Sequence, residues 1–302
     1  MTTDPIPFPQ SPARAVSGAR LGTWLVIGSA LAWSFGGMID RFIETPQTWT
    51  VVFWRSLYAS AFLIVFLLAR DGRGSLKAFR DMGWPGLIVA LCFMTASISF
   101  VQAIALTSVA NVILINATVP LAAALIAWLV FGEKIARATW IVIGVVIAGV
   151  TLMVSDGSAG EGSLAGNLLA LLITFVFAIA VVVTRRHSGV RMTPAVILAT
   201  ALAAGIAYTQ SGSLAVSAPD MGFLFAFGAL NLGFGMALFV TGARLIPAAN
   251  AALFGTLETV FGPIWVWLVH NETVSRMTFI GGAIVLLALI VHLYFERRRV
   301  GI

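Results

Sequence analysis

Two ionisable side chains, Arg55 and Glu258, lie inside long apolar stretches of the sequence and are the first candidates for chemistry. Charged groups at membrane depth are costly, so they usually face a partner or a wet cavity. Arg55 could be the counter-charge of a bound carboxylate, or a structural clamp on backbone carbonyls or on Glu258. Glu258 could bind and release a proton, or it could stay charged beside Arg55 or polar neighbours. The residue types leave both pairs of alternatives open.

Four amide side chains form a second group of candidates. Asn111 and Asn250 open two apolar stretches, where an asparagine can cap free backbone amides. The alternative is that the positive end of the helix dipole at these positions faces a bound carboxylate. Gln102 and Asn231 add hydrogen-bonding groups at membrane depth, although such groups also bond between helices. Each amide is therefore a candidate binding residue with a structural alternative.

Deep aromatic residues could complete a binding cavity. Trp33, Trp54, Tyr58 and Phe100 lie well inside apolar stretches. Together they could line a cavity that accepts an apolar or aromatic group, or cover an ammonium group by cation–π contact. Packing against lipid is an equal alternative for each residue taken singly.

Two more glutamates lie at the ends of apolar stretches. Glu133 is followed by Lys134 and Arg137, and Glu272 is followed by Arg276. Oppositely charged side chains this close in sequence usually form ion pairs at the membrane surface. We therefore expect structural roles for both glutamates.

Composition and motif content exclude several classes of protein. The chain has 302 residues, of which 60% are hydrophobic and 10% charged, whereas about a quarter of residues are charged in soluble domains. One cysteine and three histidines are too few for a disulfide framework or a zinc cluster. Phosphate loops, nucleophile elbows and His-Glu metal motifs are absent, so we expect no metal site, no cofactor and no enzymatic activity. The net charge of +6 fits basic cytoplasmic loops, so no nucleic-acid partner is expected.

Long apolar helices must position these candidates. A bilayer core about 30 Å thick needs about 20 apolar residues per helix, whereas barrel strands alternate over about ten. The pattern predicts an all-α integral membrane protein with ten transmembrane helices, at 22–41, 48–69, 84–106, 109–131, 136–154, 164–184, 194–210, 220–241, 247–269 and 277–295.

The basic residues predict the orientation of these helices. With a cytoplasmic N-terminus, only Arg41 and Arg276 fall in outer loops, and the other interhelical basic residues fall inside. We therefore expect a multi-pass protein of the inner (cytoplasmic) membrane with both termini in the cytoplasm. The expected flanking segments are a disordered cytoplasmic tail at 1–21, an extracytoplasmic linker at 155–163 and a basic cytoplasmic tail at 296–302.

The two halves of the chain, 22–154 and 164–295, are related by an internal repeat. Residues 108–133 align without gaps with 247–272, at the offset of 139 residues that separates Asn111 from Asn250. Trp128 and Glu133 match Trp267 and Glu272 in the same register. Because each half holds five spans, an odd number, the second half must enter the membrane from the opposite face. Inverted halves of this kind can exchange inward-open and outward-open states around a site between them.

The fourth and ninth spans also carry a family pattern. Its elements are Asn111 and Pro120 in the fourth span, Phe131–Gly132–Glu133 at its end, and Leu257–Glu258 in the ninth span. Over residues 22–295 this pattern resembles the EamA type of the drug/metabolite transporter superfamily. The chain departs from it at Thr259, where the family often has proline, and at Asn271, where it usually has glycine. Pro263 lies one turn further on, so a kink in the ninth helix is expected to be displaced.

Within that superfamily, the pattern through Trp33, Trp54 and Arg55 is most similar to exporters of aromatic and neutral amino acids of the YddG type. This resemblance implies a secondary transporter that exports small amphipathic metabolites by alternating access across the lipid bilayer. Proton coupling through Glu258 is one alternative for its energy source. Alternative functions are a drug or sugar-derivative carrier of the same superfamily and a passive, channel-like facilitator. The pattern specifies no oligomeric state.

Overall fold

The computed structural model describes residues 12–132, 135, 137–155, 163–187, 189–243, 245–246 and 248–300, and its regular elements are helices. In chain order they are α1 (Pro12–Ser34), α2 (Gly36–Asp40), α3 (Thr48–Asp71), the 3₁₀ helix η1 (Gly72–Gly74), α4 (Ser75–Asp81), α5 (Gly83–Leu106), α6 (Val109–Asn116), α7 (Val119–Phe131), α8 (Arg137–Ser155), α9 (Leu164–Arg186), α10 (Thr193–Gln210), α11 (Ala218–Phe225), the π-helix η2 (Ala226–Phe234), α12 (Gly235–Gly242), α13 (Ala248–His270) and α14 (Arg276–Val300).

These elements form ten spans, the number that the hydropathy pattern predicts. Within the described residues, seven helical stretches are long and apolar enough to cross a membrane: Arg20–Asp40, Thr48–Asp71, Gly83–Leu106, Val109–Phe131, Leu164–Arg186, Thr193–Gln210 and Ala218–Gly242. α8, α13 and α14 complete the ten, and α8 and α14 hold shorter apolar stretches, Thr139–Met153 and Arg276–His292. The all-α membrane class is confirmed.

Helix continues further toward both ends of the chain than the sequence predicts. α1 begins at Pro12 and not at residue 22, so the expected tail at 1–21 is helical from residue 12; the rest of that tail lies outside the described residues. α14 continues to Val300, into the expected basic tail. Proline is favourable in the first turn of a helix, and arginine and glutamate have high helix propensity. Loss of hydrophobicity therefore ends the apolar span without ending the helix.

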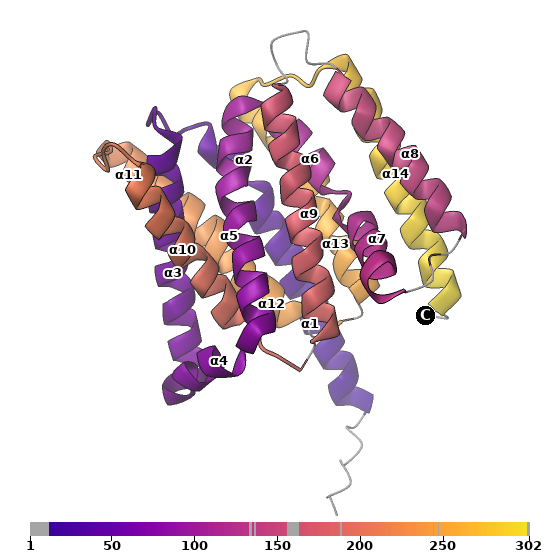
Figure 1. The fold of residues 1–302 in the computed structure, drawn as a ribbon, viewed down its shortest axis with the longest axis horizontal. Helices are drawn as coiled ribbons and strands as arrows, with labels where there is room; N and C mark the ends of the chain where they lie inside the picture. Colours follow the sequence, from indigo (N-terminus) through magenta and orange to yellow (C-terminus); the bar gives the residue numbers. More distant parts are fainter. Residues whose placement is uncertain are drawn as a thin grey trace, which may run out of the picture.

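Helices from the two halves of the chain alternate around the centre of the bundle (Figure 1). α5 packs along α9, α3 along α10, and α1 along α12 and α13, so neighbouring helices come from opposite halves. α8 and α14 pack on each other at the edge of the bundle. Their approach is close, because a Cβ atom at Gly149 would lie 2.9 Å from the carbonyl oxygen of Gly281. Because α8 and α14 lie at the edge, the eight other spans can surround an internal site.

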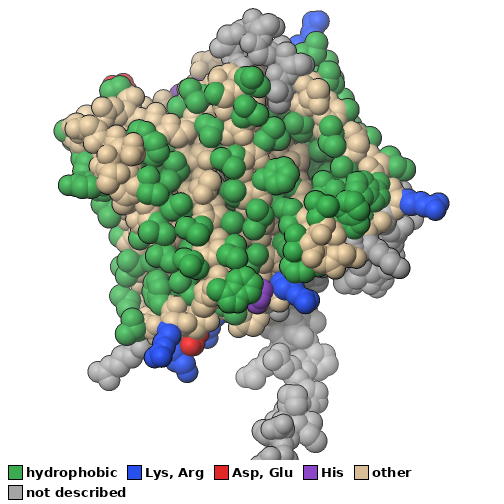
Figure 2. Space-filling view, in the orientation of Figure 1, with side chains coloured by type: hydrophobic (Ala, Val, Ile, Leu, Met, Phe, Trp, Pro, Cys, Tyr) green, Lys and Arg blue, Asp and Glu red, His purple; other side chains and the backbone are tan. Residues whose placement is uncertain are grey.

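The surface fits a lipid environment. In Figure 2 hydrophobic side chains cover the visible face, and the charged side chains lie along its rim. Trp24 and Trp84, near the ends of their spans, are 71% and 64% exposed, as expected of tryptophans at a membrane interface. The bundle has two distinct ends: the α11 end, where α2 also ends, and the α4 end, opposite to it (Figure 1). These two names are kept below.

Three spans are interrupted. The first breaks at Phe35, between α1 and α2. The fourth breaks between α6 and α7, where Pro120 in the first turn of α7 has no N–H to donate. The eighth contains the nine-residue π-helix η2. Irregular backbone at membrane depth is tolerated where it is buried in protein or lines a cavity, and π-helical segments often occur at functional sites. The breaks therefore indicate that a functional site lies near the centre of the bundle.

Candidate functional site

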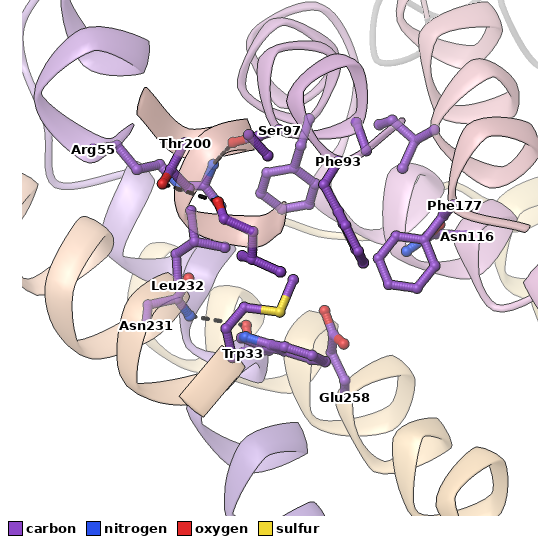
Figure 3. Close-up of a pocket in the computed structure, with 16 residues that line it drawn as sticks. Trp33, Arg55, Phe93, Ser97, Asn116, Phe177, Thr200, Asn231, Leu232 and Glu258 are labelled. Atoms are coloured by element: carbon purple, nitrogen blue, oxygen red, sulfur yellow. Dashed lines mark hydrogen bonds between the residues drawn. The ribbon is translucent and has the colours of Figure 1, made fainter. Parts of the chain in front are cut away.

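A cavity of ≈ 120 Å³ lies between the two halves of the chain (Figure 3). The first half contributes Trp33, Arg55, Phe93, Ala96, Ser97, Phe100 and Asn116, and the second half contributes Ile173, Phe177, Val196, Ala199, Thr200, Asn231, Leu232, Met236 and Glu258. Five of the residues singled out from the sequence are thus brought together here. They are Trp33, Arg55, Phe100, Asn231 and Glu258.

Glu258 lies on α13, with its carboxyl group at the cavity. In Figure 3 it lies on the opposite side of the cavity from Arg55 and beside Trp33. Among the described residues, none forms an ion pair with Glu258 within 4.0 Å. The sequence hypothesis that Arg55 clamps Glu258 is therefore not confirmed, because the two side chains do not form an ion pair. Glu258 is half-buried and its carboxylate faces the space that a ligand would fill.

Arg55 is held by other groups. Its side chain is buried, and Nη1 donates a 3.0 Å hydrogen bond to Ser97 Oγ. The guanidinium carbon lies 4.4 Å from the ring centre of Phe227 and 5.4 Å from that of Phe100, distances at which cation–π attraction operates. The cation is therefore stabilised by a hydroxyl group and two rings.

The π-helix η2 and the break in the first span are joined by Asn231. Its Nδ2 donates to the carbonyl oxygens of Ala32 (2.6 Å) and Trp33 (3.2 Å), close to the point where α1 ends. A Cβ atom at Gly36 would lie 3.2 Å from Asn231 Oδ1, so the glycine allows this close approach. The Asn231 amide thus supplies hydrogen bonds to backbone carbonyls near the break, and these bonds hold Trp33 at the cavity wall.

Several polar atoms at the cavity lack a protein partner. Across the part of the chain that the structure describes, the buried side-chain atoms without a hydrogen-bond partner are Trp33 Nε1, Arg55 Nε, Ser56 Oγ, Asn116 Oδ1 and Asn167 Nδ2. Trp33, Arg55 and Asn116 line the cavity. Leaving such a group unpaired costs about 1–3 kcal/mol. Trp33 Nε1 lies against Gly235 of α12, so Arg55 Nε and Asn116 Oδ1 are the two atoms of this set that a polar ligand could satisfy.

Two of the predicted aromatic residues lie elsewhere. Trp54 Nε1 donates to the carbonyl oxygen of Leu214 (3.0 Å), and the Tyr58 hydroxyl lies 2.9 Å from Met221 Sδ. The two rings stack with centroids 5.8 Å apart. They join α3 to the segment around α11 and do not line the cavity. Gln102 is half-buried on α5 and is also absent from the cavity wall.

Asn111 belongs to a buried polar network. Thr278 Oγ1 donates a 2.6 Å hydrogen bond to Asn111 Oδ1, and Asn111 Nδ2 donates to Thr107 Oγ1 (3.4 Å) and Asn167 Oδ1 (3.3 Å). The expected capping role is wrong, because Ser108 caps α6 and accepts from the Asn111 backbone N–H. Asn111 bonds between helices instead. Asn250 lies in the first turn of α13, and its side chain lies outside the described residues.

Glu272 forms an ion pair that the sequence does not predict. Arg41 Nε donates to Glu272 Oε2 at 2.8 Å, and Arg41 Nη1 donates to the carbonyl oxygen of Ile104 at 2.8 Å. Glu272 Oε1 accepts from the Val109 backbone N–H at 3.1 Å. The expected local partner, Arg276, is replaced by a residue far away in the sequence. Glu133 and Lys134, the other expected ion pair, lie outside the described residues.

Other contacts close the α11 end across the two halves. They are the 3.0 Å approach of His270 Nε2 to the Met38 carbonyl oxygen, the Phe42–Phe223 stack at 5.0 Å, and the hydrogen bond from Thr45 Oγ1 to Asp220 Oδ2 at 2.7 Å. At the α4 end, Arg191 Nη1 pairs with Asp71 Oδ2 at 2.9 Å. The cavity wall includes Val196 in the first turn of α10, on the α4 side. Arg55 and Phe100, which also line the cavity, lie toward the α11 ends of α3 and α5, so the cavity spans the centre of the bundle.

Some wall residues were missed by sequence reasoning, although a signal for them exists. Phe93, Ser97 and Phe100 lie at positions i, i+4 and i+7 of α5 and therefore share one helix face. Starting from Phe100, helical periodicity alone would have found the other two. Phe177 lies on α9 facing Phe93, with ring centroids 5.1 Å apart. Asn116, recognisable in the sequence as an amide at membrane depth, directly precedes the break between α6 and α7.

A ten-span helical membrane protein whose two halves enclose a small polar and aromatic cavity has the architecture of a carrier. The family model of the EamA-like transporter family matches residues 20–155 and 164–294. The chain therefore belongs to the EamA-like transporter family and is a multi-pass membrane transporter of the drug/metabolite transporter superfamily.

Comparison with solved structures supports the fold. One crystal structure has a TM-score of 0.67 and 18% sequence identity, and the alignment covers 92% of this chain and 98% of that one. At this identity the likeness concerns the fold alone. The comparison with curated proteins gave no match.

Proposed function

We propose that this protein is a secondary transporter that exports small amphipathic metabolites, above all aromatic and neutral amino acids, by alternating access. The cavity is the observation that carries the proposal. It combines the carboxylate of Glu258, the guanidinium of Arg55 and the rings of Trp33, Phe93 and Phe177 within one small space. An amino acid with an apolar side chain offers groups that complement all of these. A drug or sugar-derivative carrier is the alternative within the family.

The proposed orientation places the α4 end in the cytoplasm and the α11 end outside. Basic residues support it, because Lys77 and Arg80 lie on α4, and cytoplasmic loops carry an excess of lysine and arginine. In this orientation both termini are cytoplasmic, the protein resides in the inner membrane, and the halves 22–154 and 164–295 are inverted repeats. The contacts at the α11 end then close the outer side of the cavity.

Alternating access requires that the closed end open while the other end closes. Helices of opposite halves are neighbours around the cavity, so a movement of one half against the other would change access from both sides at once. Glu258 is the candidate for proton coupling in this cycle. It has no ion-pair partner within the described residues, and a proton could replace the substrate as the group that compensates its charge.

Transport by the purified full-length protein in liposomes tests the proposal. We expect saturable uptake of labelled phenylalanine and leucine, accelerated by unlabelled amino acid on the opposite side of the membrane. Liposomes without protein and liposomes given a labelled sugar are the controls. Linear, non-saturable flux without counterflow would indicate a passive channel, and saturable transport of the sugar or of a cationic drug alone would favour the alternative carrier function.

A further inference from the structure

One side of the cavity carries two acceptors, Asn116 Oδ1 and the Glu258 carboxylate, that are incompletely satisfied within the described part of the chain. Asn116 Oδ1 is buried without a partner, and the Glu258 carboxylate forms no ion pair with any residue in the described segments. An amide oxygen and an ionised carboxylate can only accept hydrogen bonds. A ligand that satisfies both must therefore donate N–H or O–H groups, and a positive charge would compensate Glu258.

Aromatic rings accompany these acceptors. Trp33 lies beside Glu258 in Figure 3, and its indole nitrogen abuts Gly235 of α12. The Trp33 N–H therefore faces α12, and the ring is available to the cavity. Phe93 and Phe177 meet edge to face with centroids 5.1 Å apart, and both line the cavity. A carboxylate with aromatic faces near it is the combination that recognises ammonium groups attached to an apolar body.

The opposite side differs, because the cation there already has protein partners. Arg55 is only 5% exposed, its Nη1 is bonded to Ser97, and the Phe227 ring covers its guanidinium group. Arg55 thus has protein partners at Nη1 and over the face of its guanidinium group, with Nε left unpaired, whereas the Glu258 charge has no ion-pair partner among the described residues. The two charged sides of the cavity therefore differ in how many protein groups contact the charge.

We propose that Glu258 and Asn116 form the recognition site for a substrate ammonium group, and that this group, and not the carboxylate, is the obligatory part of the substrate. This inference rests on the proposed transport function and broadens its substrate class. The class becomes amphipathic primary amines, of which aromatic and neutral amino acids are members that also carry a carboxylate. Anions of the same shape without an amine are excluded.

The size of the cavity limits the size of the apolar part of the substrate. Its volume of ≈ 120 Å³ is close to that of an engineered cavity of about 150 Å³ that binds benzene. A single six-membered ring is therefore the largest rigid group that fits without rearrangement of the wall. Phenethylamine, phenylalanine and 3-phenylpropionate share that ring and differ only in their charged groups, so they are suitable probes.

Binding of these three probes to the purified full-length protein, measured by isothermal calorimetry in detergent, tests the inference. We expect phenethylamine and phenylalanine to bind with affinities within about tenfold of each other, and 3-phenylpropionate to bind at least thirtyfold more weakly. Glu258→Gln should weaken phenethylamine binding about thirtyfold or more, the scale expected when one partner of a desolvated charge pair is removed. Glu44→Gln, which removes an exposed carboxylate on the loop after α2, should leave binding unchanged.

A second variant keeps the test decisive if Glu258→Gln gives little folded protein. Asn116→Leu removes the unpaired acceptor while keeping a similar volume, and it should weaken phenethylamine binding several-fold without a matching effect on 3-phenylpropionate. Equal binding of phenethylamine and 3-phenylpropionate, or undiminished phenethylamine binding in Glu258→Gln, would overturn the inference. A role of Glu258 in proton coupling alone gives the second of these results, because binding would survive while proton-driven transport is lost.

The binding assay also separates this inference from the proposed function. If phenethylamine binds and Glu258→Gln abolishes its binding while liposomes transport no amino acid, the amine site stands and the amino-acid function fails. If phenylalanine is transported and 3-phenylpropionate competes as well as phenethylamine does, the transport function stands and the amine site fails. Each result thus contradicts one of the two proposals and leaves the other unaffected.

Discussion

The ion pair between Arg41 and Glu272 links the two halves at the α11 end, and its removal should open that end. Arg41→Gln abolishes the 2.8 Å bond to Glu272 and the 2.8 Å bond to the Ile104 carbonyl oxygen. The two side chains are 27% and 24% exposed, so the pair is neither a surface pair worth about 0.2–1 kcal/mol nor a buried one worth about 3–5 kcal/mol. An intermediate loss of about 1.5 kcal/mol is reasonable.

This loss predicts a measurable change in accessibility. If the pair exists only while the α11 end is closed, its removal shifts the equilibrium toward the open state about tenfold, since about 1.4 kcal/mol corresponds to a factor of ten. The probe is Thr200→Cys in a Cys92→Ser background, because Thr200 lines the cavity and is 2% exposed. Modification by a membrane-impermeant maleimide added outside intact cells should become about tenfold faster with Arg41→Gln.

A matched control and a charge exchange test the reasoning. Arg70→Gln also removes an arginine from an ion pair, with Asp71 at the α4 end, and should not accelerate labelling from outside. Arg41→Glu combined with Glu272→Arg should recover part of the slow rate. Unchanged labelling in Arg41→Gln, or equal acceleration by Arg70→Gln, would refute the view that this pair closes the outer side.

Three further predictions concern selectivity, stability and topology. Phe177→Ala enlarges the cavity and should raise the affinity for tryptophan relative to phenylalanine several-fold in competition assays; an unchanged ratio would remove Phe177 from the binding wall. Asn231→Ala removes two hydrogen bonds to backbone carbonyls near the break in the first span and should lower stability by about 1–3 kcal/mol, seen as earlier thermal unfolding in detergent than that of the parent protein. In a Cys92→Ser background, external maleimide should label Ala215→Cys and not Lys77→Cys, both exposed positions; the reverse pattern would contradict the proposed orientation.

The spans are largely predictable because hydropathy is a local property that bilayer thickness constrains. The predicted helices at 48–69 and 84–106 correspond to Thr48–Asp71 and Gly83–Leu106. Errors occur where hydropathy and helix propensity diverge, as at the charged end of α14. The π-helix in the eighth span has no local pattern that we recognised, because it depends on what packs against it.

The polar and aromatic candidates show what depends on tertiary structure. Sequence places Trp33 and Trp54 at similar depth, yet only Trp33 reaches the cavity, while Trp54 bonds to Leu214. Hydropathy does not encode the rotation of a helix about its axis when all its faces are apolar, and packing against neighbouring helices decides it. Composition could likewise identify Arg55 and Glu258 as unusual, but only the fold places them on opposite sides of one cavity.

Partners that are far apart in the sequence also depend on tertiary structure. Glu272 pairs with Arg41 and Asn111 bonds to Thr278, in each case across the two halves of the chain. Sequence reasoning assigned Glu272 a neighbour in the chain because local pairs are the ones that spacing can predict. The sequence by itself therefore determines which residues enter the membrane, the repeat and the family. The tertiary structure decides which of the costly polar groups meet each other and which remain to meet a ligand, because that depends on contacts between segments far apart in the chain.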